Sequence, residues 1–202
     1  MLQGEALTIG RGGLCLLEGV SFSLSPGQAL MLRGANGIGK TTLLRTVAGL
    51  QPLWGGTLQV DPEDLAFAGH ADGVKATLSV RENLSFWAGV FGSSGLEEAL
   101  ERFRLTALED RAARDLSAGQ RRRLGLARLL LTGRRIWLLD EPTVSLDRAT
   151  SEVFEAVLAD HLGQGGSALI SSHLDIGGVT EALDLTPFRA KAGAHSDEGA
   201  FL

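Results

Sequence analysis

Residues 34–41 read Gly34-Ala35-Asn36-Gly37-Ile38-Gly39-Lys40-Thr41. This segment matches the pattern G-x-x-x-x-G-K-[ST], in which glycines allow several backbone N–H groups to converge on phosphate oxygens. The apolar run 29–32 before it is typical of a strand buried on both faces, and segment 42–48 after it is predicted to form a helix that Gly49 terminates. Strand, glycine loop and helix together predict a nucleoside triphosphate site.

Two side chains of this loop have specific expected roles. Lys40 would reach the β- and γ-phosphates, and the Thr41 hydroxyl would ligate Mg²⁺. The alternative, a glycine-rich turn without a ligand, is disfavoured because the loop joins a predicted strand to a predicted helix. The residues expected to bind the phosphates are Gly34, Ala35, Asn36, Gly37, Ile38, Gly39, Lys40, Thr41 and Thr42.

Two acidic residues follow a second apolar strand, predicted over 136–139. Ligands of open α/β sheets lie outside the carboxyl ends of the strands, so Asp140 and Glu141 are expected near the phosphates. Asp140 is suited to holding Mg²⁺ through water, and Glu141 to accepting a proton from the attacking water. Taken without the phosphate loop, the pair would be interpreted as solvated acids at a strand end.

The remaining pattern predicts an α/β fold with a parallel sheet. Strands are expected at 19–24, 28–33, 57–60, 65–68, 136–139 and 167–171. Apolar residues at helical spacing predict helices from about 80 to 91, 118 to 131 and 151 to 162. Ser94 and Glu97 have the spacing of a capping box and predict the start of a further helix.

Composition limits the possible functions. The chain has 202 residues, of which 44% are hydrophobic and 21% charged, as in a globular domain. A net charge of −5 provides no basic field for nucleic acid, so we expect no nucleic-acid partner, and the arginines at 121–123 are interpreted as a solvated helix face. No apolar run reaches the length of a membrane span, and we expect a cytoplasmic protein.

Three short motifs complete an ordered set. Leu116-Ser117-Ala118-Gly119-Gln120 precedes the acidic pair, Asp147 ends Val144-Ser145-Leu146-Asp147, and His173 follows the last predicted strand. With the phosphate loop, they resemble the motifs of ABC transporter ATPase subunits over roughly residues 5–185. The resemblance implies a P-loop NTPase (RecA-like) core with a parallel sheet, an antiparallel N-terminal β subdomain and a small inserted α-helical subdomain. It also implies ATP and Mg²⁺ as cofactors.

The resemblance assigns further roles. The signature residues Leu116, Ser117, Ala118, Gly119 and Gln120 would cap the γ-phosphate bound to a second copy, so that nucleotide joins a head-to-tail homodimer. Asp147 would span the dimer interface, and His173 would contact the γ-phosphate.

The sequence departs from the family pattern at three positions. Ala118 replaces the glycine that the family favours. Arg11 stands about where the family stacks an aromatic ring on adenine, and its guanidinium could stack instead. His70 occupies the place of the glutamine that usually links Mg²⁺ to the helical subdomain, and it could bind either Mg²⁺-bound water or the attacking water.

The whole chain is expected to be one ABC ATPase domain. Residues 1–77 and 132–189 would form the nucleotide-binding core, 78–131 the helical subdomain and 190–202 a loose tail. Segment 68–79, together with the signature, is most similar to ATP-binding subunits of bacterial cytochrome c maturation (haem export) systems.

This resemblance implies a separate membrane permease and a peripheral place on the cytoplasmic face of the bacterial inner membrane. One aromatic of Phe86, Trp87 and Phe91 is expected to be exposed toward that permease, with the other two in the core. The alternatives are the ATPase of another ABC exporter, of lipoprotein or drug, and a soluble ABC ATPase without a transport role.

Overall fold

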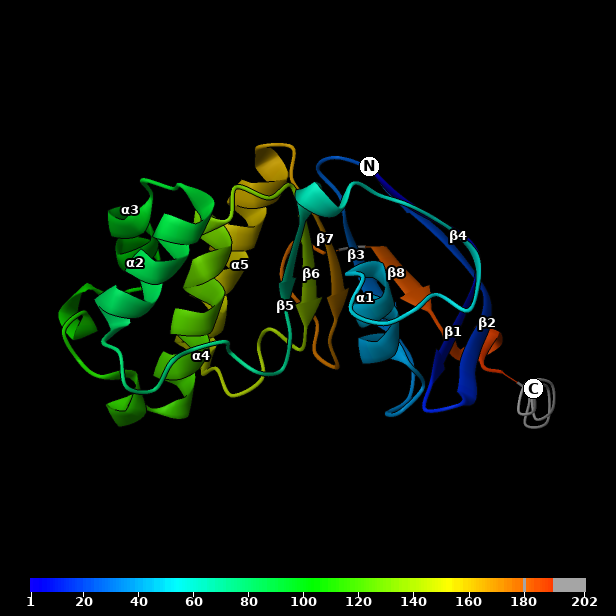
Figure 1. Ribbon diagram of the computed structural model, residues 1–202, viewed down its shortest axis with the longest axis horizontal. Helices are drawn as coiled ribbons and strands as arrows, with labels where there is room; N and C mark the ends of the chain where they lie inside the picture. The colour runs from blue at the N-terminus through cyan, green and yellow to red at the C-terminus, as the bar shows by residue number, and fades with distance from the viewer. Residues whose placement is uncertain (180, 191–202) are drawn as a thin grey trace, which may run out of the picture.

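The computed structural model describes residues 1–179 and 181–190, and a five-stranded parallel sheet crosses its centre (Figure 1). The strands run in the order β5-β6-β7-β3-β8. Their bounds are β3 Ala29–Arg33, β5 Leu65–Ala68, β6 Ile136–Asp140, β7 Ser167–Ser171 and β8 Glu181–Asp184. Every neighbouring pair is parallel, as the alternation of strands and helices predicted. The predicted α/β fold is therefore confirmed.

A second, antiparallel sheet has the order β2-β1-β4. Its strands are β1 Leu2–Arg11, β2 Leu14–Leu24 and β4 Gly55–Gln59. Strand β1 was not predicted from the sequence, and neither was β8 in the parallel sheet. Strand β1 has no regular alternation, because register shifts between Gly4 and Leu7 and again near Ile9 disturb the two-residue period of its buried side chains.

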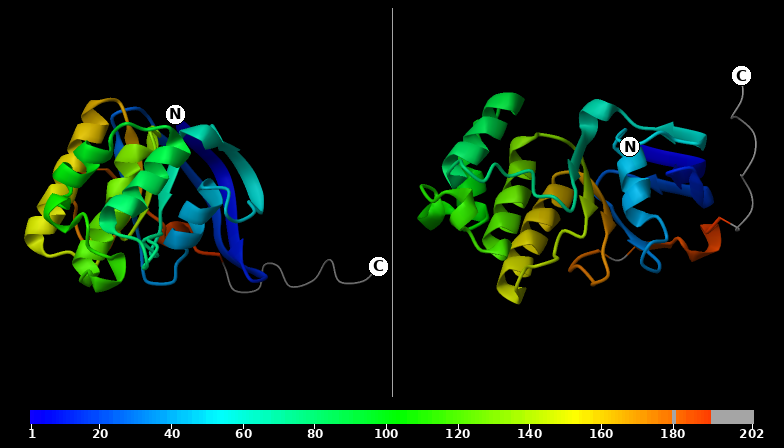
Figure 2. Two further views of the ribbon diagram at one scale, coloured as in Figure 1. Left: turned by 60° about the vertical axis from the view of Figure 1, so that its left-hand side comes forward. Right: turned by 60° about the horizontal axis from the view of Figure 1, so that its bottom comes forward.

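Helices lie on both faces of the parallel sheet (Figures 1 and 2). Their bounds are α1 Lys40–Val47, α2 Val80–Phe91, α3 Leu96–Arg102, α4 Ala118–Ala127 and α5 Arg148–Gly163. Both figures place α2 and α3 at the end of the molecule opposite the antiparallel sheet. The chain therefore carries its inserted helices on one side of the parallel sheet and its second sheet on the other.

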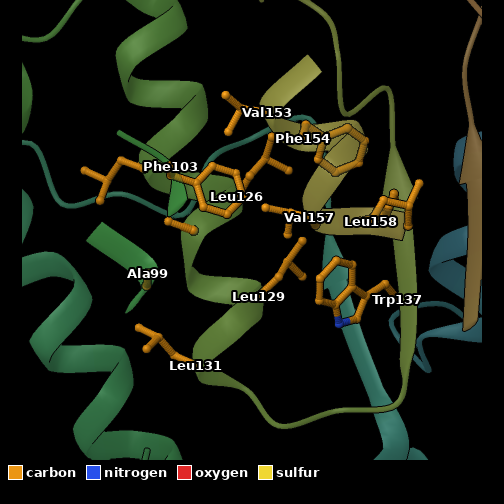
Figure 3. Packing of buried hydrophobic residues seen from close by; sticks show 14 of the residues in the cluster. Ala99, Phe103, Leu126, Leu129, Leu131, Trp137, Val153, Phe154, Val157 and Leu158 are labelled. Carbon is orange, nitrogen blue, oxygen red and sulfur yellow. The ribbon is translucent and has the colours of Figure 1, made fainter. Parts of the chain in front are cut away.

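Strand β6 shows why the parallel strands are apolar on both faces. Trp137 and Leu139 pack with α4 and α5, in the cluster that Figure 3 shows. Ile136 and Leu138 pack with α1 and the antiparallel sheet. Because successive side chains of a strand point to opposite faces, one continuous apolar run supplies two hydrophobic cores.

Several predicted boundaries were wrong. Helix α3 starts after Gly95 without a side-chain cap, and the Ser93 hydroxyl instead accepts the Gly95 N–H, so the capping box predicted at Ser94 does not form. Helix α4 ends at Ala127 and continues as a 3₁₀ turn, Arg128–Leu131. Helix α5 begins three residues earlier than predicted, at Arg148. The tail predicted over 190–202 lies outside the described residues from 191 onward.

His161 of α5 lies against the amino-terminal half of β6. Its ring stacks on Trp137, with 3.7 Å between the ring centroids and 8° between the planes. A Cβ atom on Gly166 would approach the His161 ring to 2.3 Å, so glycine is needed there for the stack to form. Burial lowers the pKa of His161 below its ordinary value of 6.5.

This stack predicts a pH-dependent stability. The unfolded chain binds a proton at His161 more readily than the folded chain, so the free energy of unfolding should fall as the pH drops through about 6.5. His161→Phe keeps the stacking but does not titrate, and it should lose less stability between about pH 7.5 and about pH 5.5. Urea unfolding at several pH values measures this difference. Equal pH slopes for the two proteins would contradict the assignment.

Candidate nucleotide-binding site

The phosphate loop connects β3 to α1 at the carboxyl edge of the parallel sheet. Gly34, Gly37 and Gly39 have φ angles of 138°, 77° and 123°, which side-chain-bearing residues rarely adopt. Lys40 is only 8% exposed, and its Nζ donates to the Gly34 carbonyl at 2.8 Å and the Ala35 carbonyl at 3.3 Å. The lysine thus lies across the loop, where a phosphate can replace these carbonyls as its partner.

Asp140 links the ends of β6 and β7 to the start of α1. Its Oδ1 accepts the Thr41 hydroxyl at 3.0 Å and the Ser171 hydroxyl at 2.5 Å. The carboxylate and the Thr41 hydroxyl are hard oxygen ligands, and one or two such groups beside phosphates suit Mg²⁺. Among the described residues no group of three or more His, Cys, Asp or Glu could form a separate metal site. Ser171 was not predicted, because a single serine inside an apolar strand carries no motif.

Glu141 and His173 face each other beside this cluster. His173 Nε2 lies 3.4 Å from Glu141 Oε1, and the His173 backbone N–H donates to Glu141 Oε2 at 3.4 Å. Glu141 has a φ of 49°, in the left-handed region, and its N–H donates to the Ser171 carbonyl at 2.9 Å. The geometry brings together two residues that are 32 positions apart in the sequence.

A cavity of about 690 Å³ contains most of these groups. This volume is in the range of ligand sites. Its wall is made by Arg11, Gly12, Leu14, Leu16, Asn36, Gly37, Gly39, Lys40, Thr41, Thr42, Glu141, Ser171 and His173. Arg11 thus lines the same cavity as the phosphate loop, and its contact with a base stays a prediction. Leu14, which is exposed, and Leu16, which is half-buried, were not predicted, since single apolar residues of a hairpin carry no nucleotide signature.

The signature residues lie outside that cavity wall. Ser117 is the N-cap of α4 and forms a capping box with Gln120, so its hydroxyl accepts the Gln120 N–H at 3.2 Å. Asp147 is the N-cap of α5, and the hydrogen bonds from Thr150 lower the pKa of its carboxyl group. Ser117 and Asp147 thus each cap a helix of their own chain.

His70 is exposed and lines a smaller cavity of about 140 Å³, which it shares with Glu141, Ala118 and Ser145. Residue 70 is not part of the larger cavity wall. The chain therefore brings His70 to the side of Glu141 that faces the signature helix.

A family model described as ABC transporter matches residues 17–144, which is more than half of the chain. The chain belongs to the ABC transporter family of ATPases. It is 59% identical to the cytochrome c biogenesis ATP-binding export protein CcmA of Rhodobacter capsulatus, over 100% of this chain and 95% of that protein. It is also 59% identical to the CcmA protein of Ruegeria pomeroyi, over 97% of each chain. The family resemblance predicted from the motifs is confirmed.

Solved structures agree with this assignment. A putative ABC transporter ATP-binding protein from Pyrococcus furiosus has a TM-score of 0.84 at 26% identity, covering 94% of this chain and 99% of that chain. The P-loop NTPase fold of this ABC ATPase is thus confirmed, and the family identifies it as an ATP-hydrolysing enzyme. In the described part of the chain, no helix combines the length and apolar character needed to cross a membrane.

The position of Arg11 predicts a contribution to base binding. If its guanidinium stacks on adenine, Arg11→Ala should weaken ATP binding by about 1 kcal/mol, or roughly fivefold in Kd. Affinity for inorganic triphosphate should stay unchanged, because that ligand has no base. Isothermal titration of both ligands measures the difference, with Arg45→Ala in α1 as the control. An equal loss for both ligands would show that Arg11 acts on the phosphates.

Proposed function

We propose that this chain is the ATP-hydrolysing subunit of an ABC exporter complex that serves c-type cytochrome biogenesis, by haem export or by release of haem from a chaperone. The observation that carries the proposal is the 59% identity, over the full chain, to export proteins named for that process. The other exporter classes considered from the sequence, for lipoprotein or drug, have no specific observation in their favour.

The residues in and beside the cavity have different roles in ATP hydrolysis. Lys40 and the N–H groups of the phosphate loop bind the β- and γ-phosphates. Thr41 and Asp140 would hold Mg²⁺, which when bound would neutralise charge that develops on the phosphates. Glu141 accepts a proton from the attacking water, and His173 beside it contacts the γ-phosphate.

A second copy of the chain completes the site. The cavity of one chain has phosphate-binding groups on its loop side, and its wall includes none of the signature residues 116–120. In a head-to-tail homodimer the N-terminus of α4, with Ser117 and Gly119, would bind the γ-phosphate from the partner side. Asp147 would then lie at the interface between the two copies.

A permease would dock beside α2. Phe86 and Val90 are 58% and 56% exposed on this helix. Trp87 is half-buried against the core and stacks on Phe91, with 5.9 Å between the ring centroids. Phe86 is therefore the exposed aromatic of this helix, and it would anchor the permease. His70, close to Glu141, would relay the nucleotide state to this surface. Docking to the permease would place the subunit on the cytoplasmic face of the inner membrane.

The role of Glu141 is tested by Glu141→Gln. The amide cannot accept the proton of the attacking water, so we expect ATP turnover to fall by about 100-fold or more. Equilibrium ATP binding should stay within about threefold of wild type, because the phosphate loop is intact. Steady-state phosphate release and fluorescence titration measure the two quantities. Turnover within twofold of wild type would refute the assignment.

The docking surface is tested by Phe86→Asp. An aromatic anchor in an interface commonly contributes about 2 kcal/mol or more, so this variant should no longer co-purify with the permease. ATPase activity of the isolated subunit should be unchanged, since Phe86 is not among the residues of the cavity wall. Ser85→Asp, an exposed neighbour on α2, is the matched control. An intact complex with Phe86→Asp would place the docking surface elsewhere on the subunit.

A further inference from the structure

Arg122 of α4 is buried, with 6% of its surface exposed. All five N–H groups of its guanidinium have an acceptor. Nε donates to the Pro142 carbonyl at 3.1 Å, and Nη2 donates to the carbonyls of Asp140 at 3.1 Å and Glu141 at 2.8 Å. Nη1 donates to the Gly69 carbonyl and to the Asp72 carboxylate, both at 2.9 Å. The interpretation of Arg121–Arg123 as a solvated face is therefore wrong for Arg122.

These bonds join three segments that are distant in the sequence. One is the signature helix α4, the second is the turn that carries Asp140 and Glu141, and the third is the loop of Gly69 to Asp72, which contains His70. The loop packs closely on α4, because a Cβ atom on Gly125 would lie 2.8 Å from Asp72 Cβ and 2.9 Å from its carbonyl oxygen. Glycine at 125 therefore allows the Asp72 carboxylate to reach Arg122.

The contact to Glu141 matters most for chemistry. Glu141 has a left-handed backbone, a conformation that persists only where neighbouring groups hold it. Its N–H is bonded to Ser171 and its carbonyl to Arg122, so both peptide groups of the residue are fixed. The direction of the Glu141 side chain, toward His173 and the cavity, follows from this fixed backbone.

We propose that Arg122 is a positioning residue for ATP hydrolysis. It holds the turn of Glu141 so that the carboxylate meets the attacking water, and it ties that turn to the signature helix and to the His70 loop. Movement of either segment would reach Glu141 through one guanidinium. The proposal rests on the role of Glu141 as the general base.

Only a planar group with several donors can serve this position. A lysine at 122 has one nitrogen, which cannot reach Gly69 and Asp72 on one side and Glu141 and Pro142 on the other at the same time. An apolar residue would leave buried carbonyls without donors. The two replacements, Arg122→Lys and Arg122→Met, therefore remove the contact to different degrees.

The test measures kcat, the Kd of ATP and the melting temperature of the full-length chain. For Arg122→Met we expect kcat to fall by about 100-fold, as for a misplaced catalytic group, while the Kd of ATP stays within about threefold. Arg122→Lys should lose about tenfold in kcat at unchanged Kd. The control is Arg123→Met in the same helix, whose guanidinium donates to the carbonyls of Phe103 and Arg104 in the helical part and should keep its kcat.

A double variant separates positioning from a general structural role. If Arg122 acts through the Glu141 carboxylate, then Arg122→Met should slow the residual turnover of Glu141→Gln by no more than about threefold. If the two substitutions reduce turnover independently, so that their fold-losses multiply in the double variant, the proposal is overturned. A wild-type kcat in Arg122→Lys would also overturn it. Full turnover in Glu141→Gln alone would instead refute the general base, and with it the proposed function of that residue.

Discussion

One carboxylate connects the elements that meet at the carboxyl edge of the parallel sheet. Asp140 Oδ1 accepts hydroxyls from Thr41 and Ser171, so the ends of β6 and β7 and the start of α1, which follows β3, meet at one buried atom. Parallel strands bring their carboxyl ends to a common edge, but hydrogen bonds of this kind fix the relative positions of the residues that follow. Lys40, Glu141 and His173 each lie next to, or two residues from, a member of this cluster.

The antiparallel sheet and α4 add further groups to this edge of the parallel sheet. On one side the hairpin of the antiparallel sheet adds Arg11 and Leu14 to the cavity wall, where a base could lie. On the other side α4 contributes Arg122, which binds the backbone of the acidic turn. The alternating side chains of β6 support both sides, because they fill a separate hydrophobic core on each face of the sheet. The candidate site therefore lies at the carboxyl edge of the sheet, which has one of these cores on each face.

Motifs were enough to predict the family and the parallel sheet, because a glycine-rich loop between an apolar strand and a helix is a local sequence pattern. Long-range partners could not be predicted in this way. Ser171 carries no motif in the sequence, and only the fold brings it to Asp140. Arg122 is one of three consecutive arginines in the sequence, and only the fold shows that it is buried. Strand β1 was missed because its register shifts disturb the alternation. Ser94 had the right spacing for a cap, but the hydroxyl of Ser93 is the one that bonds the helix start.

The central claim is that one chain provides half of each ATP site and that the signature of a second chain provides the other half. Native mass spectrometry of Glu141→Gln with Mg²⁺ and ATP tests it most directly, alone and combined with Ser117→Arg. We expect a species with two chains and two ATP for the single variant, and single chains that each carry one ATP for the combined variant. ATP-loaded single chains in the first sample, or an unchanged dimer in the second, would contradict it.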